Sequence, residues 1–290
     1  MTHTAVVTGA TSGIGLAAAR ELARRGMFVI GIGRDRTRCE SARCDILQSC
    51  PDAKIEYILG DLSTTTEVRA LAARVAELIK ASGRNSLEVL MHVAGTVSSW
   101  HVNTSEAYEL QFAVNHLAPF LLTNELLPLL RRSEDARVLA VSSESHYRTR
   151  IRWKDIMMHR HYSCLTAYKQ SKLCNALFIF ELARREDSIS AYAIDPGLVS
   201  TDIGLKGTKG IERFVWKLRQ KSGDPPETPA MYMVNIATMP RYVKKSGLYW
   251  KDGGEKKASR VARDEAEAKK LWDYSLKLCG IPCPERNEPQ

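Results

Sequence analysis

TGATSGIG, residues 8–15, follows the apolar run TAVVT (4–8) and leads directly into an amphipathic helical run. A glycine-rich turn between a strand and a helix directs backbone N–H groups and the positive end of the helix dipole at an anion. Gly9 permits a tight turn, Gly13 lets the backbone approach a pyrophosphate, and Gly15 allows close helix–sheet packing. The predicted dinucleotide-binding residues of this turn are Gly9, Thr11, Ser12, Gly13, Ile14 and Gly15.

Outward from this turn, short apolar runs alternate with helical runs along the chain. Strands that are apolar on both faces and separated by helices are typical of a parallel sheet covered on both sides. We therefore predict an α/β doubly wound Rossmann fold with a seven-stranded parallel sheet, in one domain over residues 1–290. The pattern is interrupted at about 198–245, where we expect an irregular substrate lid over the ligand crevice. The predicted strands are 4–8, 27–33, 54–59, 87–94, 136–143, 188–195 and 246–250.

The second predicted strand ends at Gly33-Arg34-Asp35-Arg36, where a dinucleotide fold distinguishes its cofactors. The guanidinium of Arg34 suits the 2′-phosphate of NADP(H), whereas an acidic residue at the strand tip favours the ribose hydroxyls of NAD(H). The alternatives are Asp35 as a ribose ligand and Arg34 as an ordinary surface residue. We predict NADP(H) in preference to NAD(H).

Asp61 and Leu62 follow the third predicted strand in the run GDLS. At the carboxyl end of that strand they are placed to flank an adenine. A helix N-cap by Asp61 or Ser63 is an equally good interpretation of the same residues.

Composition limits the classes of function. Forty-two Lys and Arg against 33 Asp and Glu give the chain a formal charge of +9. These basic residues are spread along the sequence, so we expect a solvated basic surface and no nucleic-acid partner. The seven cysteines form no C-x-x-C pair and the histidines show no metal-ligand spacing, so no metal site is expected and reduced thiols fit best. Without a signal-like N-terminus or a run of about eighteen apolar residues, the predicted location is cytoplasmic.

A tyrosine and a lysine four residues apart begin YKQSKLCN, residues 168–175. On a helix this spacing puts Tyr168 and Lys172 on one face. The two side chains are either a proton-transfer pair or ordinary helix surface, and the rest of the sequence decides between them.

The glycine turn, Asp61-Leu62, Asn115, Ser143 and Tyr168-x-x-x-Lys172 occur in this order, and together they resemble the short-chain dehydrogenase/reductase family over about residues 3–250. The runs VNHLAPFLLTNELLPLL, VSSESHY and YKQSKLCNALFIFELARR are most similar to its retinol dehydrogenase-like branch, which also resembles the protochlorophyllide reductases. The resemblance implies an NADP(H)-dependent oxidoreductase that transfers a hydride between nicotinamide and a carbonyl or alcohol. Its branch implies a lipophilic substrate of retinoid, steroid or fatty type.

The resemblance also implies catalytic roles. Tyr168 would be the general acid in carbonyl reduction or the base in alcohol oxidation, with its pKa lowered by the Lys172 ammonium one helical turn away. Lys172 would also hold the nicotinamide ribose. Ser143, with Ser142 as the competing candidate, would donate a hydrogen bond to the substrate oxygen. Asn115 would hold a water that connects Lys172 to solvent.

Two further segments match the family's cofactor contacts. DPGLVST (195–201) would shape the loop beside the nicotinamide, with the Val199 backbone on the carboxamide and the Thr201 hydroxyl on the diphosphate. VAG (93–95) resembles the family's N-A-G, with Val93 in place of an asparagine that stabilises the sheet. The residues implied as cofactor contacts are therefore Ala94, Gly95, Pro196, Gly197, Val199 and Thr201, besides Tyr168 and Lys172.

Other features are interpreted as structural. Cys174 lies on an apolar helix face and is expected to fill the core. The run 173–185 is expected to be core or a helix-pairing face, which would make a homodimer. The run IERFVWKLR (211–219) describes an amphipathic basic helix. It is either a lid that touches an anionic membrane surface or, as we expect, a short helix packed on the domain.

A non-catalytic NADP(H) sensor on the same fold is the alternative to an enzyme. The set Ser143, Asn115, Tyr168 and Lys172 argues for the enzyme, because a sensor does not need that geometry.

Overall fold

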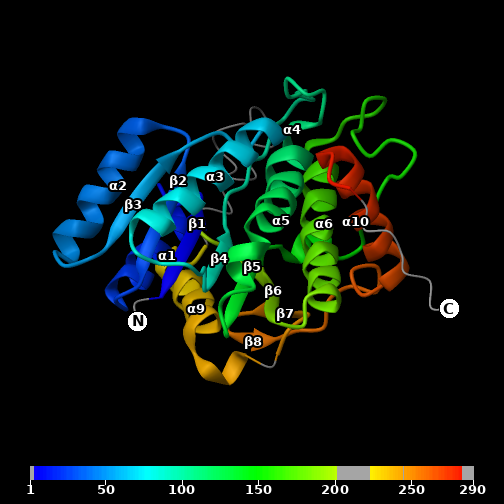
Figure 1. The fold of residues 1–290 in the computed structure, drawn as a ribbon. Helices are drawn as coiled ribbons and strands as arrows, with labels where there is room; N and C mark the ends of the chain where they lie inside the picture. Colours follow the sequence, from blue (N-terminus) through cyan, green and yellow to red (C-terminus); the bar gives the residue numbers. More distant parts are fainter. Residues whose placement is uncertain (1–2, 201–222, 244, 283–290) are drawn as a thin grey trace.

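A single sheet organises the chain in the order β3-β2-β1-β4-β5-β6-β7-β8, seen at the centre of Figure 1. The computed structural model describes residues 3–200, 223–243 and 245–282. All neighbouring strands from β3 to β7 are parallel, so the seven-stranded parallel sheet is confirmed, and each predicted strand agrees within two residues at either end. A short antiparallel strand, β8, was not predicted. The strands are β1 Thr4–Thr8, β2 Phe28–Gly33, β3 Ile55–Leu59, β4 Val89–His92, β5 Ala136–Val141, β6 Ile189–Asp195, β7 Leu248–Lys251 and β8 Gly254–Glu255.

Helices cover both faces of the sheet because each buried strand is apolar on both sides. In β1, Val6 packs in the cluster that includes residues of α3, α5, α6 and α10, whereas Ala5 and Val7 pack in the cluster with α1, α2 and α9. The order of the strands reverses at β1, which has β2 and β4 as neighbours, and α/β folds bind ligands at such a switch point. The helices are α1 Gly13–Arg24, α2 Arg36–Ser49, α3 Thr65–Ala81, α4 Leu110–Phe112, α5 Ala118–Leu130, α6 Cys164–Arg185, α9 Glu227–Thr238 and α10 Glu265–Cys279, with the π-helical η1 Ala113–Leu117 and the 3₁₀ turns η2 Glu144–His146 and η3 Pro240–Tyr242.

The segment 198–245 is only partly what the sequence predicted. Residues 201–222 and 244 lie outside the described residues, and with them the amphipathic run 211–219. The later part is not irregular, because residues 227–238 form α9. Val234 and Ala237 are buried on this helix, which packs along α1 (Figure 1). The periodicity of the sequence did not indicate α9, because two prolines directly precede it and proline interrupts a helical pattern. Proline is nevertheless favoured at helix N-termini.

The helix α6 is buried on nearly every side. Its run 173–185 was expected to be core or a helix-pairing face, and α10 of the same chain packs against it. Trp272 of α10 stacks on Phe178 at 6.1 Å and meets Phe120 edge-on at 4.9 Å between ring centroids. The core interpretation is confirmed, while the homodimer stays a prediction. Among the helices of the described ranges, none combines the length and apolar character needed to cross a membrane.

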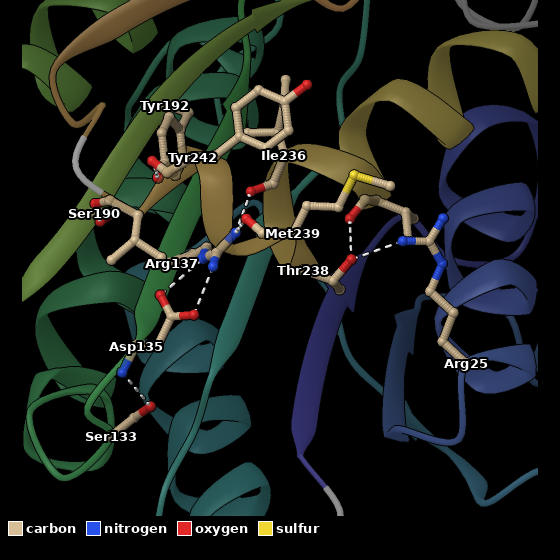
Figure 2. A network of polar contacts seen from close by, with 12 residues as sticks. Arg25, Ser133, Asp135, Arg137, Ser190, Tyr192, Ile236, Thr238, Met239 and Tyr242 are labelled. Atoms are coloured by element: carbon tan, nitrogen blue, oxygen red, sulfur yellow. Dashed lines mark hydrogen bonds and ion pairs between the residues drawn. The ribbon is translucent and has the colours of Figure 1, made fainter.

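A fully buried arginine on β5 holds the end of α9 (Figure 2). Arg137 pairs with the Asp135 carboxylate at 2.8 Å from Nε, and its Nη1 donates to the carbonyl oxygens of Ile236 at 2.7 Å and Met239 at 2.8 Å. These carbonyls belong to the last turn of α9 and the residue after it, where an α-helix leaves acceptors without helical partners. The guanidinium therefore caps α9 from the sheet side.

Replacing Arg137 with methionine should lower the free energy of unfolding by about 3 kcal/mol, because one buried and one partly buried carbonyl lose their donor. Arg24→Met is the matched control: the Arg24 side chain is 65% exposed beside Glu21, so its loss should leave the free energy of unfolding nearly unchanged. Urea unfolding followed by circular dichroism measures both variants. Equal losses of stability would contradict the capping role of Arg137.

Candidate active site

A cleft of about 650 Å³ opens at the carboxyl ends of β1, β2 and β4. It brings together residues that are distant in the sequence, at the switch point of the sheet. Of the predicted cofactor residues, the cleft is lined by Gly9, Thr11, Ser12, Gly13, Ile14, Gly15, Arg34, Asp61, Leu62, Ala94 and Gly95. The sequence did not single out Thr96, Val114, Ser200 and Pro226, which line it too.

The glycine turn is shaped so that larger residues would not fit. Gly9 has a φ of +70°, and a Cβ there would lie 2.9 Å from Ala94. A Cβ on Gly15 would lie 2.2 Å from the carbonyl oxygen of Gly9. Ser12 precedes α1 without making a capping hydrogen bond from its side chain, unlike the cap residues of α2, α3, α6 and α10 in the described chain. The first N–H groups of α1 therefore face the cleft as donors for an anion, which fits a dinucleotide pyrophosphate.

Two arginines line the cleft beyond the end of β2. Arg34 was predicted and Arg38 was not, and both are exposed. Asp35, the alternative ribose ligand, caps α2 by accepting a hydrogen bond from the backbone N–H of Arg38 at 2.9 Å. Its carboxylate is therefore engaged, although it also lines the cleft. The signal for Arg38 was its position in the first turn of a helix that starts at the strand tip.

Asp61 and Leu62 line the cleft next to Gly60. The alternative interpretation, a helix N-cap by Asp61 or Ser63, is wrong. Thr64 is the N-cap of α3, and its hydroxyl accepts from the Glu67 N–H at 3.3 Å. Asp61 instead accepts from the N–H of Ser63 at 3.0 Å and so forms the turn that leads to the helix.

The hydroxyl of Thr8 joins the ends of β1 and β4. It accepts hydrogen bonds from the backbone N–H groups of Val93 and Ala94, each at 3.1 Å. The sequence raised a question about Val93, which stands where the family has an asparagine. Here the amides of this loop are held by a side chain of the neighbouring strand, so the loop is fixed against Gly9 without that asparagine.

Asn115 lies in the π-helical segment η1, and such segments often occur at functional sites. Its side chain accepts from the Thr96 N–H at 2.7 Å and donates to the Thr96 carbonyl at 3.0 Å. It also donates to the Ser171 hydroxyl on α6 at 3.0 Å. Asn115 therefore connects the loop after β4 with the helix that carries Tyr168 and Lys172.

Lys172 is buried beside Tyr168. Its Nζ lies 5.6 Å from the centroid of the Tyr168 ring and donates to the Val141 carbonyl at 3.1 Å. Burial lowers the pKa of this lysine to about 8. Asn175, which the sequence did not single out, donates to the same carbonyl at 3.0 Å. Its position in the run Lys-x-x-Asn was the available signal, because i and i+3 residues share a helix face.

The structure separates the two candidate serines. Ser142 is fully buried, and its hydroxyl donates to the Lys172 carbonyl at 2.8 Å. Ser143 is half-buried, and its Oγ accepts from the N–H of Ser145 at 3.2 Å. The hydroxyl proton of Ser142 is thus engaged in a hydrogen bond within the fold. Ser143 Oγ only accepts a hydrogen bond, so its proton can be donated to a ligand. The geometry therefore favours Ser143 over Ser142 as the serine that contacts a substrate.

The loop after β6 begins with a fixed turn. Gly197 has a φ of +73°, and its N–H donates to Asp195 at 3.0 Å. Asp195 also accepts from the Tyr249 hydroxyl at 2.8 Å. Pro196 and Val199 lie in this loop outside the lining of the main cleft, and Thr201 lies outside the described residues.

Cys174, two residues after Lys172, is fully buried in the core, and burial raises the pKa of its thiol. A neutral, enclosed thiol packs and does not react. The interpretation of Cys174 as a packing residue is consistent with this position.

The strand order, the uncapped α1 and the cleft define a nucleotide-binding α/β protein of the doubly wound class. The family model for short chain dehydrogenases matches residues 3–210. The chain belongs to this family, in the retinol dehydrogenase-like branch, and is an oxidoreductase.

Curated relatives match nearly the whole chain. Retinol dehydrogenase 12 of Mus musculus is 35% identical over 95% of this chain and 86% of its own length. Retinol dehydrogenase 13 of Homo sapiens is 33% identical over 98% of this chain and 87% of its own length. Among solved structures, an uncharacterised protein from Mycobacterium Paratuberculosis has a TM-score of 0.73 and 30% identity, covering 98% of this chain and 95% of the other.

Lys172→Met should raise the free energy of unfolding at pH 7 by roughly 1–3 kcal/mol, because it removes a charge whose burial lowers its pKa to about 8. In the unfolded chain a lysine has a pKa near ~10.4, so between these values the unfolded state binds more protons and wild-type stability rises with pH. The advantage of the variant should therefore be full below pH ~8 and shrink above it.

Urea unfolding at several pH values between 7 and 10 measures this difference. Lys169→Met, on the exposed side of the same helix, is the control and should change stability by less than about 0.5 kcal/mol at every pH. If the difference in free energy of unfolding between Lys172→Met and wild type stays constant over this pH range, the charge of the buried ammonium is not its cause.

Proposed function

We propose that this protein is an NADP(H)-dependent oxidoreductase that interconverts a lipophilic carbonyl compound and its alcohol. The observation that carries the proposal is the arrangement at the carboxyl end of β5. Lys172 lies 5.6 Å from the centroid of the Tyr168 ring and donates to the Val141 carbonyl, and Ser142, the neighbour of Ser143 in the chain, donates to the Lys172 carbonyl. The cleft with the uncapped N-terminus of α1 opens at the same edge of the parallel sheet. The bound nicotinamide supplies or accepts the hydride. The protein residues hold the reactants and move the proton.

Tyr168 is proposed as the proton carrier. A free phenol has a pKa near ~10, so it holds its proton at neutral pH and gives it to a developing alkoxide during carbonyl reduction. The Lys172 ammonium stabilises the phenolate left behind, because a nearby positive charge favours the charged form of the acid. Ser143 donates its hydroxyl proton in a hydrogen bond to the same substrate oxygen and so stabilises the charge that forms there.

Arg34 and Arg38 support NADP(H) as the cofactor. Both line the cleft at the tip of β2, while the competing carboxylate of Asp35 caps α2. Guanidinium groups match the geometry of a phosphate and form charge-assisted hydrogen bonds with it. Arg34 and Arg38 would hold the 2′-phosphate of NADP(H).

A lipophilic substrate is supported by the names of the relatives and by exposed apolar side chains. Trp100, Leu165 and Leu198 are 49%, 41% and 42% exposed. They lie after β4, three residues before Tyr168 and after β6, so all three come from the carboxyl side of the sheet. Contact with these apolar side chains would remove the hydrocarbon of a lipophilic substrate from water.

Tyr168→Phe should lower kcat for carbonyl reduction by about 10²–10⁴-fold, because the proton donor is lost, while the Kd for NADPH stays within about threefold. A panel of a retinoid aldehyde, a steroid ketone and a fatty aldehyde, followed at the absorbance of NADPH, measures the rates. Tyr232→Phe, on the exposed side of α9, is the control and should keep wild-type kcat. Unchanged turnover by Tyr168→Phe would contradict the proposed mechanism. If the wild-type protein binds NADPH tightly but turns over no compound of the panel, a sensor is favoured.

Arg34→Ala and Arg38→Ala should each weaken NADPH binding by about tenfold and leave NADH binding nearly unchanged, because only NADPH carries the 2′-phosphate. Arg36→Ala removes a neighbouring exposed charge that does not line the cleft, and it should change neither affinity by more than about twofold. Fluorescence titration with both cofactors measures the Kd values. Parallel losses for NADPH and NADH would overturn the assignment of these arginines to the 2′-phosphate.

A further inference from the structure

A buried histidine contacts the backbone of Ser143. His146, in the 3₁₀ turn η2, is fully buried, and its Nδ1 lies 2.7 Å from the Ser143 carbonyl oxygen. The backbone N–H of His146 donates to the same carbonyl at 3.0 Å. Because a carbonyl oxygen only accepts, Nδ1 carries the proton and donates it.

The other ring nitrogen fixes this tautomer. The backbone N–H of Ser259 donates to Nε2 of His146 at 3.0 Å. Since an N–H group donates, Nε2 must be unprotonated, so the two partners together allow only the neutral ring with its proton on Nδ1. Ser259 lies between β8 and α10, more than a hundred residues further along the chain.

Aromatic packing holds the ring in place. The centroid of His146 lies 4.2 Å from that of Tyr147 and 4.8 Å from that of Tyr249. Tyr249 is itself fixed by its hydrogen bond to Asp195, the residue that starts the loop after β6. The ring is therefore confined in both position and orientation.

We propose that His146 is a positioning residue for the reaction: it holds the Ser143 peptide so that the serine hydroxyl faces the substrate oxygen. The proposal rests on the proposed function, because it requires Ser143 to contact the substrate. The Nδ1–H and the backbone N–H of His146 both donate to the Ser143 carbonyl, and the N–H of Ser145 donates to the Ser143 Oγ. The Ser143 hydroxyl therefore has little freedom to move. The amide of Ser259 links this arrangement to the C-terminal part of the chain.

Three substitutions separate the two hydrogen bonds of the ring. His146→Asn places an amide N–H where Nδ1 is and keeps the bond to the Ser143 carbonyl. His146→Gln places an acceptor near Nε2 and keeps the bond from Ser259 instead. His146→Phe keeps the aromatic packing and loses both bonds. Each is made alone, and His146→Phe is also combined with Ser143→Ala, using NADPH and the aldehyde of the panel with the highest wild-type kcat.

His146→Phe should lower kcat by about 10–100-fold, with the Kd for NADPH within about twofold of wild type. His146→Asn should keep kcat within about fivefold of wild type, and His146→Gln should resemble His146→Phe. In the Ser143→Ala background, His146→Phe should lower kcat by less than about twofold, because the group it positions is gone. If His146→Phe does not fold, the kcat values of His146→Asn and His146→Gln are compared instead. Equal kcat values for these two variants would overturn the proposal.

The role of His146 and the role of Ser143 can be tested separately. If Ser143→Ala lowers kcat and His146→Phe still exerts its full effect in that background, the positioning role is overturned and the proposed function stands. If Ser143→Ala keeps wild-type kcat, the role of Ser143 in the proposed function is overturned, and the role of His146 with it.

Discussion

The carboxyl end of β5 is bound to α6 by three hydrogen bonds, and the candidate active site depends on them. The carbonyl of Val141 accepts from both Lys172 and Asn175, and the hydroxyl of Ser142 donates to the carbonyl of Lys172. A strand end and a helix that are bonded in this way cannot slide past each other. Ser143, one residue beyond the strand contacts, therefore keeps a fixed distance from the helix face that carries Tyr168 and Lys172.

The same contacts explain why a lysine can be buried here. The ammonium of Lys172 has a backbone carbonyl and an aromatic face as neighbours, and an isolated charge in the core would destabilise the fold by more. The remaining penalty is visible in its lowered pKa. A protein often accepts such a loss of stability at the site where the charge is needed for chemistry.

The sequence predicted the sheet and the turn because both follow local rules. Each core strand is a short apolar run between turn residues, and the glycine turn of residues 8–15 is confined to one strand–helix junction. The contacts that the sequence missed are not local. Arg137 caps a helix about a hundred residues away, and an arginine in an apolar strand carries no periodic signal. Arg38 and Asn175 were within reach of helix spacing, whereas Thr8 as the acceptor for Val93 required knowledge of which strands are neighbours.

The π-helical segment η1 has a consequence for the two ends of its helix. One inserted residue rotates everything after it by about 100° relative to a continuous α-helix. Asn115 can therefore turn toward Thr96 and Ser171, while the apolar side of α5 keeps its own alignment on the sheet. Without the extra residue, either Asn115 would point away from Thr96 and Ser171 or the apolar side of α5 would point away from the sheet. The insertion lets a single helix present Asn115 to the candidate active site and its apolar residues to the core.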